Sequence, residues 1–108
     1  MKKILFCCFL LLFLVSGCSF KDDNKLVLVT EAGFAPYEFY QDGEIVGVDI
    51  DIAKEIAKEL GKELVVKDVS FDFLINEVKS GKADFAAAGI SITDERKKQV
   101  DFTDEYTV

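Results

Sequence analysis

The sequence predicts an α/β fold with a mostly parallel sheet, preceded by a leader that is not part of the fold. Three observations support this. Short apolar runs rich in β-branched residues alternate with helical patterns, in the order strand, helix, strand, helix, strand. Crossovers of this kind join parallel strands with a right-handed turn. Half of the 108 residues are apolar, which suffices for one small core but not for two domains.

The first 17 residues read as a signal peptide. Lys2 and Lys3 precede an apolar run over residues 4–15, which is shorter than the roughly 20 residues of a spanning helix. The following residues, LVSGC, resemble the lipobox of bacterial lipoproteins, in which the cysteine is acylated and becomes the new N-terminus. We therefore expect a lipid on Cys18 and a polar tether over residues 18–24. The alternative is ordinary secretion, with Cys18 a chance residue.

The composition of the processed chain excludes several functions. Cleavage before Cys18 removes Cys7 and Cys8, so no disulfide framework or cysteine metal site remains. It also removes two lysines and takes the formal net charge from −7 to −9, which argues against nucleic-acid binding. The chain has no histidine, the commonest general base and transition-metal ligand. We expect no metal and no cofactor.

The first elements are a strand and a hairpin. Residues 26–30, LVLVT, suit a strand that is buried on both faces. Residues 38–48 contain Asp42-Gly43 between two partly apolar arms, and Asp-Gly is among the best signals for a hairpin turn.

The strongest helical pattern covers residues 49–62. Asp49 or Asp51 is the expected N-cap, and Gly61 is the expected stop. The predicted apolar face consists of Ile52, Ala53, Ile56, Ala57 and Leu60. A strand over residues 63–69, a helix over 72–81 closed by Gly81, and a strand over 83–90 follow.

Three loops are expected to meet at one edge of this sheet. Ligands of parallel sheets bind at the carboxyl ends of the strands. Residues 30–37 (TEAGFAPY), 70–73 (SFDF) and 88–93 (AGISIT) leave the three predicted strands at that edge.

The loop over residues 88–93 leads into a candidate anion site. If Thr93 caps a helix that begins near Asp94, the guanidinium of Arg96 can reach an anion ahead of the cap. Ser91, Thr93 and free backbone N–H groups would contribute, and the planar fork of Arg96 matches a carboxylate or a phosphate. The alternative is a surface ion pair between Arg96 and Asp94, Glu95 or Asp101, worth about 0–1 kcal/mol.

The aromatic residues allow two interpretations. We expect most of a set of six to lie in the core, and the six are Phe34, Tyr37, Phe39, Tyr40, Phe71 and Phe73. Phe34 and Phe71 differ because each lies in a loop at the ligand edge, where a ring can enclose a small ligand. Glu31 lies at the same edge, and its carboxylate either contacts the ligand or is simply solvated.

Taken together, these segments resemble family 3 of the bacterial extracellular solute-binding proteins, which bind amino acids. The resemblance rests on G-F-x-P-Y-E-F (33–39), G-x-D-I-D-I-A (47–53), A-G-I-S-I-T-x-E-R (88–96) and D-F-T (101–103), together with the lipoprotein leader, and it extends from about residue 25 to 108. It implies a type II periplasmic-binding-protein-like lobe with three layers. It also implies an extracytoplasmic protein, lipid-anchored to the bacterial cell membrane, that delivers an amino acid to the permease of an ABC importer and acts as a monomer, not as an enzyme.

The resemblance also assigns roles to the candidate residues. Arg96 would bind the α-carboxylate in two-point fashion, with help from Ser91 and Thr93, and the carbonyl of Gly89 would receive the α-ammonium. Phe34 and Phe71 would enclose the ligand side chain. Glu31 would contact its far end, which mildly favours a polar or cationic side chain.

Two alternatives remain at this point. Some relatives of this fold are cyclohexadienyl or arogenate dehydratases, and others are ligand-sensing modules of receptors. Family members also continue into a second lobe, whereas this sequence matches only the first part of lobe one, so we expect an incomplete lobe that binds weakly by itself.

Overall fold

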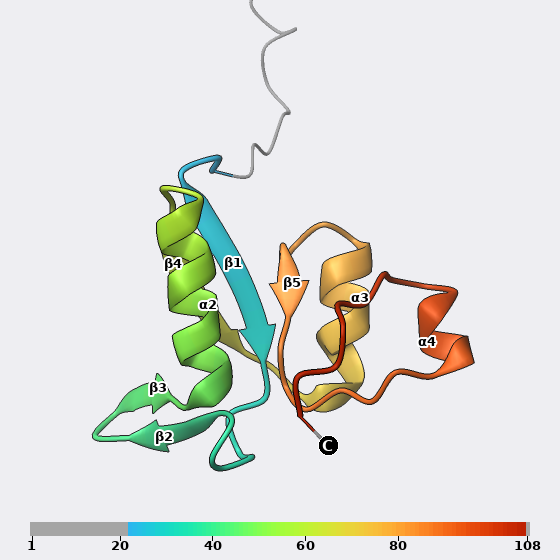
Figure 1. The fold of residues 1–108 in the computed structure, drawn as a ribbon, viewed down its shortest axis with the longest axis horizontal. Helices are drawn as coiled ribbons and strands as arrows, with labels where there is room; N and C mark the ends of the chain where they lie inside the picture. The colour runs from blue at the N-terminus through green and yellow to red at the C-terminus, as the bar shows by residue number, and fades with distance from the viewer. Residues whose placement is uncertain (1–21, 108) are drawn as a thin grey trace, which may run out of the picture.

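The computed structural model describes residues 22–107 and forms a small α/β fold (Figure 1). The predicted signal peptide, Cys18 and most of the tether lie outside the described residues. The elements are β1 (Lys25–Thr30), β2 (Phe39–Gln41), β3 (Glu44–Val46), α2 (Val48–Glu59), β4 (Glu63–Asp68), the 3-10 helix η2 (Phe71–Phe73), α3 (Leu74–Lys79), β5 (Phe85–Ala86) and α4 (Asp94–Lys97). Within residues 22–107, no helix has both the length and the apolar character needed to cross a membrane.

The main sheet confirms the predicted parallel α/β arrangement. Its strand order is β4-β1-β5, and β1 runs parallel to both neighbours. The side chains of β1 alternate between two cores. Leu28 packs with Ile50 and Ala53 of α2, whereas Val29 packs with Leu74 of α3. The helices therefore cover opposite faces of the sheet, which gives three layers.

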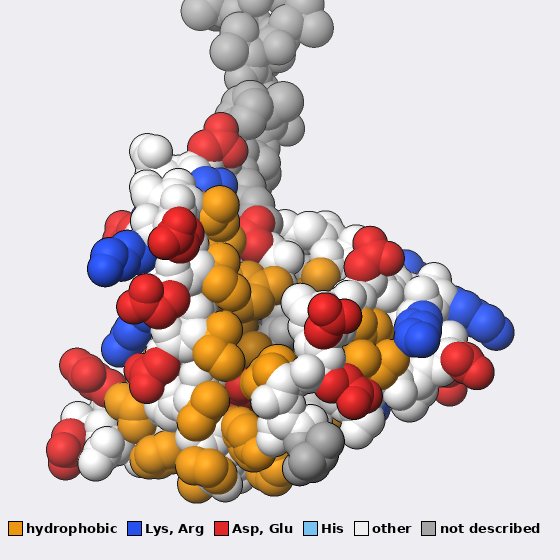
Figure 2. Space-filling model, in the orientation of Figure 1, with side chains coloured by type: hydrophobic (Ala, Val, Ile, Leu, Met, Phe, Trp, Pro, Cys, Tyr) orange, Lys and Arg blue, Asp and Glu red, His pale blue; other side chains and the backbone are white. Residues whose placement is uncertain are grey.

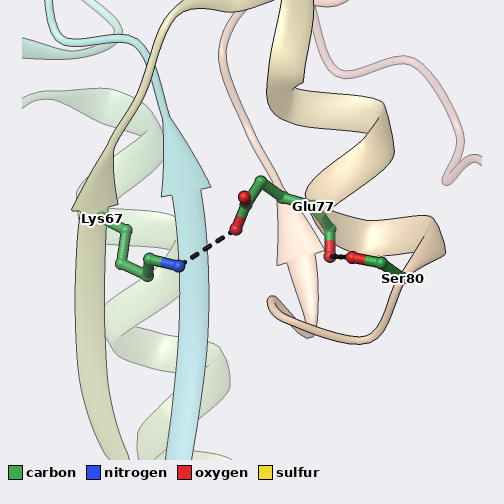
Figure 3. A network of polar contacts seen from close by, with 3 residues as sticks. All are labelled: Lys67, Glu77 and Ser80. Carbon is green, nitrogen blue, oxygen red and sulfur yellow. Dashed lines mark hydrogen bonds and ion pairs between the residues drawn. The ribbon is translucent and has the colours of Figure 1, made fainter.

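An ion pair connects two of these layers. Nζ of Lys67 in β4 lies 3.0 Å from Oε2 of Glu77 in α3. Figure 3 shows the Lys67 side chain crossing β1 to reach Glu77. The hydroxyl of Ser80 donates to the backbone carbonyl of Glu77 at 3.3 Å, which holds the last turn of the same helix.

The hairpin has the predicted turn, but the predicted cap of the following helix is wrong. Asp42 and Gly43 both have positive φ, at 51° and 81°, as a two-residue hairpin turn requires. Helix α2 starts after Gly47, with no side-chain cap. Its first N–H groups instead donate to backbone carbonyls, Val48 to Pro36 and Asp49 to Tyr37, each at 3.0 Å. The carboxylate of Asp49 therefore does not cap the helix, and the residue is buried in the interior with 1% of its surface exposed.

The buried face of α2 also differs from the prediction. Ala53 and Ala57 are buried as expected, but the other buried residues are Ile50 and Asp49. The predicted core residues Ile52, Ile56 and Leu60 are 38%, 40% and 56% exposed. The small side chains of Ala53 and Ala57 let the helix approach the sheet closely along a narrow face. The neighbouring row of Ile52, Ile56 and Leu60 therefore stays exposed to solvent. Figure 2 shows a band of apolar side chains along this side of the molecule.

Two further elements are shorter than predicted. The strand expected over residues 83–90 is a ladder of only Phe85–Ala86. Ala87 still contacts β1, since its N–H donates to the carbonyl of Val29 at 3.3 Å and its carbonyl accepts from the Thr30 hydroxyl at 2.6 Å. The helix expected over 72–81 splits into η2 and α3. The chain after α4 has no regular structure and returns to the carboxyl edge of the sheet (Figure 1).

Candidate functional site

The loops that follow β1, β4 and β5 meet at the carboxyl edge of the sheet, as predicted. They enclose a cavity of about 220 Å³. Four predicted site residues line it, namely Glu31, Phe34, Phe71 and Gly89, together with Gly33, Glu38 and Ala88. The parallel sheet brings them together because all three loops leave it at the same end.

Glu31 ties two of these loops together. Its carboxylate accepts a short hydrogen bond from the backbone N–H of Phe71. Asp68, which the sequence analysis missed, adds a second connection: it accepts from the N–H of Ala32 at 2.9 Å and from the Tyr40 hydroxyl at 2.8 Å. The sequence did offer a signal for Asp68, because a polar residue at the end of a parallel strand lies at the edge where the loops meet. The loop after β1 is therefore held by two carboxylates.

Of the two aromatic residues of the site, Phe34 lies at the surface and Phe71 is half-buried against the core. Phe34 is 51% exposed and stacks on Tyr37, with 5.3 Å between ring centroids. Gly89 lies against the Phe34 ring, since a Cβ built on Gly89 would be 2.7 Å from Cε1. Tyr40 and Phe73 are more than half exposed, so the prediction that most of the six aromatic residues are core is wrong. Phe34 and Phe71 stand as walls of the cavity.

Arg96 does not line this cavity but lies against the ring of Phe71, which does. Its guanidinium carbon is 5.5 Å from the centroid of the Phe71 ring, and Nη1 donates to the carbonyl of Ser91 at 2.8 Å. Thr93 caps α4 as predicted, accepting from the N–H of Arg96 at 3.1 Å. Arg96, Thr93 and Phe71 line a second hollow of about 440 Å³. No ion pair joins Arg96 to Asp94, Glu95 or Asp101 in the part of the chain that the structure describes.

The site residues thus form two groups that share Phe71. One group surrounds the smaller cavity. The other consists of Ser91, Thr93 and Arg96, and Phe71 contacts both groups. A third hollow, of about 430 Å³, joins Phe34 and Gly89 to Ser91 and to the chain segment over residues 102–107. The arrangement offers a carboxylate and two aromatic rings on one side and a guanidinium on the other. The guanidinium can pair with a carboxylate, and the carboxylate and the two rings can pair with a cationic side chain.

A buried carboxyl pair lies behind the cavity and was also missed. Glu38 is fully buried and Asp49 is 1% exposed. Both carboxylate oxygens of Glu38 and Oδ2 of Asp49 accept no hydrogen bond from a described donor. Burial raises the pKa of Glu38 to about 8, and the neighbouring carboxyl groups of Asp49 and Glu31 add to the shift. The signal was present, because both residues lie inside the motifs over residues 33–39 and 47–53.

Tyr106 connects this pair to the end of the chain. Its hydroxyl donates to Oδ1 of Asp49 at 2.6 Å. Burial and this hydrogen bond raise the pKa of the Tyr106 phenol. The hydroxyls of Tyr37 and Thr107 are 2.7 Å apart, which holds the same segment against the first loop. Among residues 22–107, no group of three or more His, Cys, Asp or Glu residues could hold a metal ion.

Comparison with known proteins shows close relatives among amino-acid-binding proteins. The chain is 39% identical over 83 residues to the arginine-binding extracellular protein ArtP of Bacillus subtilis, covering 77% of this chain and 32% of ArtP. It is 40% identical over 105 residues to a probable histidine-binding protein of Campylobacter jejuni, covering 88% of this chain and 41% of that protein. The chain therefore spans about a third to two-fifths of these relatives.

Solved structures support the same assignment. The arginine-bound form of domain 1 from TmArgBP is 46% identical and superposes with a TM-score of 0.74, covering 77% of this chain and 67% of that one. An ancestral cyclohexadienyl dehydratase, AncCDT-3(P188L), is 33% identical with a TM-score of 0.73, covering 78% of this chain and 35% of that one. The model of the bacterial extracellular solute-binding proteins, family 3, matches residues 26–108. The chain belongs to family 3 of the bacterial extracellular solute-binding proteins, of which it matches the N-terminal part.

Proposed function

We propose that this chain binds an L-α-amino acid with a cationic side chain, with arginine as the first candidate. The observation that carries the proposal is the lining of the 220 Å³ cavity. Its acidic residues are Glu31 and Glu38, and the Phe34 and Phe71 rings stand beside them. Aromatic faces attract a guanidinium or ammonium group, and a carboxylate completes the pairing. The arginine-binding names of several relatives point in the same direction.

The opposite end of the ligand would meet the second group of residues. Arg96 uses one N–H on the Ser91 carbonyl, and a guanidinium has five N–H donors, so others remain for an α-carboxylate. The hydroxyl proton of Thr93 is also available, because that oxygen acts as an acceptor toward the N–H of Arg96. The α-ammonium would bind the carbonyl of Gly89. We assign Ser91 to the α-carboxylate as well.

The cellular role follows from the proposed ligand and the leader. The chain would be held at the extracytoplasmic side of the membrane by lipid on Cys18 and would pass the amino acid to the permease of an ABC importer. The support is the family assignment and the LVSGC sequence at the end of an apolar run. Labelling cells with a radioactive fatty acid tests the anchor, since a Cys18→Ser variant should remain unlabelled.

Calorimetric titration tests the ligand. The full chain, solubilised in a non-ionic detergent, is titrated with arginine, lysine, glutamine and glutamate. We expect arginine to bind best. Arg96→Ala should weaken binding about 10- to 100-fold, the loss expected for hydrogen bonds to a charged group. Arg96→Lys should recover little of it, because an ammonium cannot bind a carboxylate in two-point fashion.

Lys97→Ala is the matched control, because Lys97 is exposed on the same short helix and should not affect affinity. If arginine binds equally well without the Arg96 side chain, the assignment of Arg96 to the α-carboxylate is wrong. If the folded chain binds none of the four amino acids, the proposed function is wrong.

Dehydration of a cyclohexadienyl amino acid is the second candidate, favoured by the similarity to the ancestral dehydratase. Arg96 would bind the carboxylate of such a substrate equally well. We propose binding without turnover, because the curated relatives are named as binding proteins. Incubation with arogenate, followed by chromatography, separates the two functions: loss of arogenate above the buffer rate would establish the enzyme.

A further inference from the structure

The buried carboxyl pair has no cationic partner among residues 22–107, although two carboxylates side by side repel each other. Glu31 acts on Glu38 and Tyr106 contacts Asp49, and neither of these neighbours carries a positive charge. The cavity that Glu38 lines has no lysine or arginine among its lining residues. Burial without a countercharge disfavours two ionised carboxylates.

One shared proton resolves the repulsion. Both oxygens of Glu38 and Oδ2 of Asp49 lack a described donor, so a neutral Glu38 can donate its proton to Asp49. Oδ1 of Asp49 already accepts from the Tyr106 hydroxyl at 2.6 Å, whereas neither oxygen of Glu38 has a described partner. Glu38 is therefore the member of the pair that holds the proton when the cavity is empty.

The position of Glu38 couples this proton to the ligand. Glu38 is part of the lining of the same cavity as Glu31, Phe34 and Phe71. A cation placed there favours the ionised form of a neighbouring carboxyl group. We propose that a cationic ligand in this cavity displaces the proton of Glu38 to solvent, so that binding releases one proton and leaves Glu38 ionised near the ligand charge. This inference rests on the proposed function, because it requires a cation in the cavity.

The sign of the pH dependence follows from linkage. An empty-state pKa of about 8 leaves Glu38 about nine-tenths protonated at pH 7. If the occupied state binds fewer protons, affinity rises with pH through the neutral range, by at most about tenfold per pH unit. The increase should stop above about pH 8, where Glu38 is already ionised without ligand. The affinity of a neutral ligand should lack this rise.

Titration in two buffers measures the proton directly. The full chain in detergent is titrated at pH 7 with L-arginine in phosphate and in Tris, whose different ionisation enthalpies report the protons released. L-citrulline, the uncharged analogue with the same α-amino and carboxyl groups, is the ligand control. We expect release of about half a proton or more with arginine, given the protonated fraction at pH 7. Citrulline should release much less.

Glu38→Gln keeps the size of the side chain and should abolish the release. Glu44→Gln makes the same change at an exposed position of β3 and should keep the proton release. Arginine binding without proton release, or with release that persists in Glu38→Gln, overturns this inference and leaves the proposed function standing. Failure to bind arginine overturns both. If Glu38→Gln does not fold by circular dichroism, the unaltered chain decides: its arginine affinity must rise between pH 6 and 8 while citrulline affinity stays level.

Discussion

At the scale of single residues, Gly89 shows how closely the site is fitted. Its φ of +61° lies in the left-handed region, where a side chain costs about 1–2 kcal/mol. A Cβ at this position would also press on the Phe34 ring, at 2.7 Å from Cε1. The glycine therefore serves both the turn that follows β5 and the position of the ring.

Substitution can separate these two roles. Gly89→Ala should lower the free energy of unfolding by about 1–2 kcal/mol and should also weaken arginine binding, because Phe34 must move. Gly61→Ala is the matched control, since its φ is +64° and a Cβ there meets nothing within 4 Å. It should cost similar stability in urea unfolding but leave the affinity unchanged. Equal affinities of the two variants would contradict the proposed contact of Phe34 with the ligand.

At the scale of elements, the start of α2 joins the fold to the site. The carbonyls of Pro36 and Tyr37, in the loop after β1, accept the first N–H groups of the helix at 3.0 Å. Sequence reasoning predicted where this helix lies but assigned its cap to an aspartate, since local patterns favour Asp at that position. Each actual partner lies twelve residues earlier, Pro36 for Val48 and Tyr37 for Asp49, and no local pattern indicates such a contact.

Gly47 makes this docking possible, and its substitution should be severe. A Cβ on Gly47 would lie 2.2 Å from the carbonyl oxygen of Tyr37, and its φ is +134°. We expect Gly47→Ala to lower the free energy of unfolding by about 2–4 kcal/mol, from steric overlap with backbone and from the unfavourable φ. The urea midpoint of Gly43→Ala provides the control, because that glycine has a positive φ but no neighbour within 4 Å. Equal midpoints for the two variants would mean that the helix start is not held by the loop.

At the scale of the whole molecule, the sequence predicted the layers and the loop edge but not the polar interior. Parallel topology alone placed Glu31, Phe34 and Phe71 together, because it depends on the order of the elements. The Glu38–Asp49 pair was not predicted, since the two residues lie on a hairpin arm and a helix that meet only in the folded chain. The exposed ridge of α2 was missed for a related reason: periodicity finds an apolar face but not its exact orientation.

The buried pair also makes the stability of the whole chain depend on pH. The Glu38 pKa is about 8 in the folded state and about 4.3 in an unfolded chain. Between these values the folded state holds a proton that the unfolded state has lost, so stability falls as pH rises, by at most about 1.4 kcal/mol per pH unit. Urea unfolding at pH 5, 6.5 and 8 measures the slope. Glu38→Gln should flatten the slope, whereas the exposed Glu44→Gln should retain it. Parallel slopes for Glu38→Gln and the unaltered chain would show that Glu38 is already ionised in the empty protein.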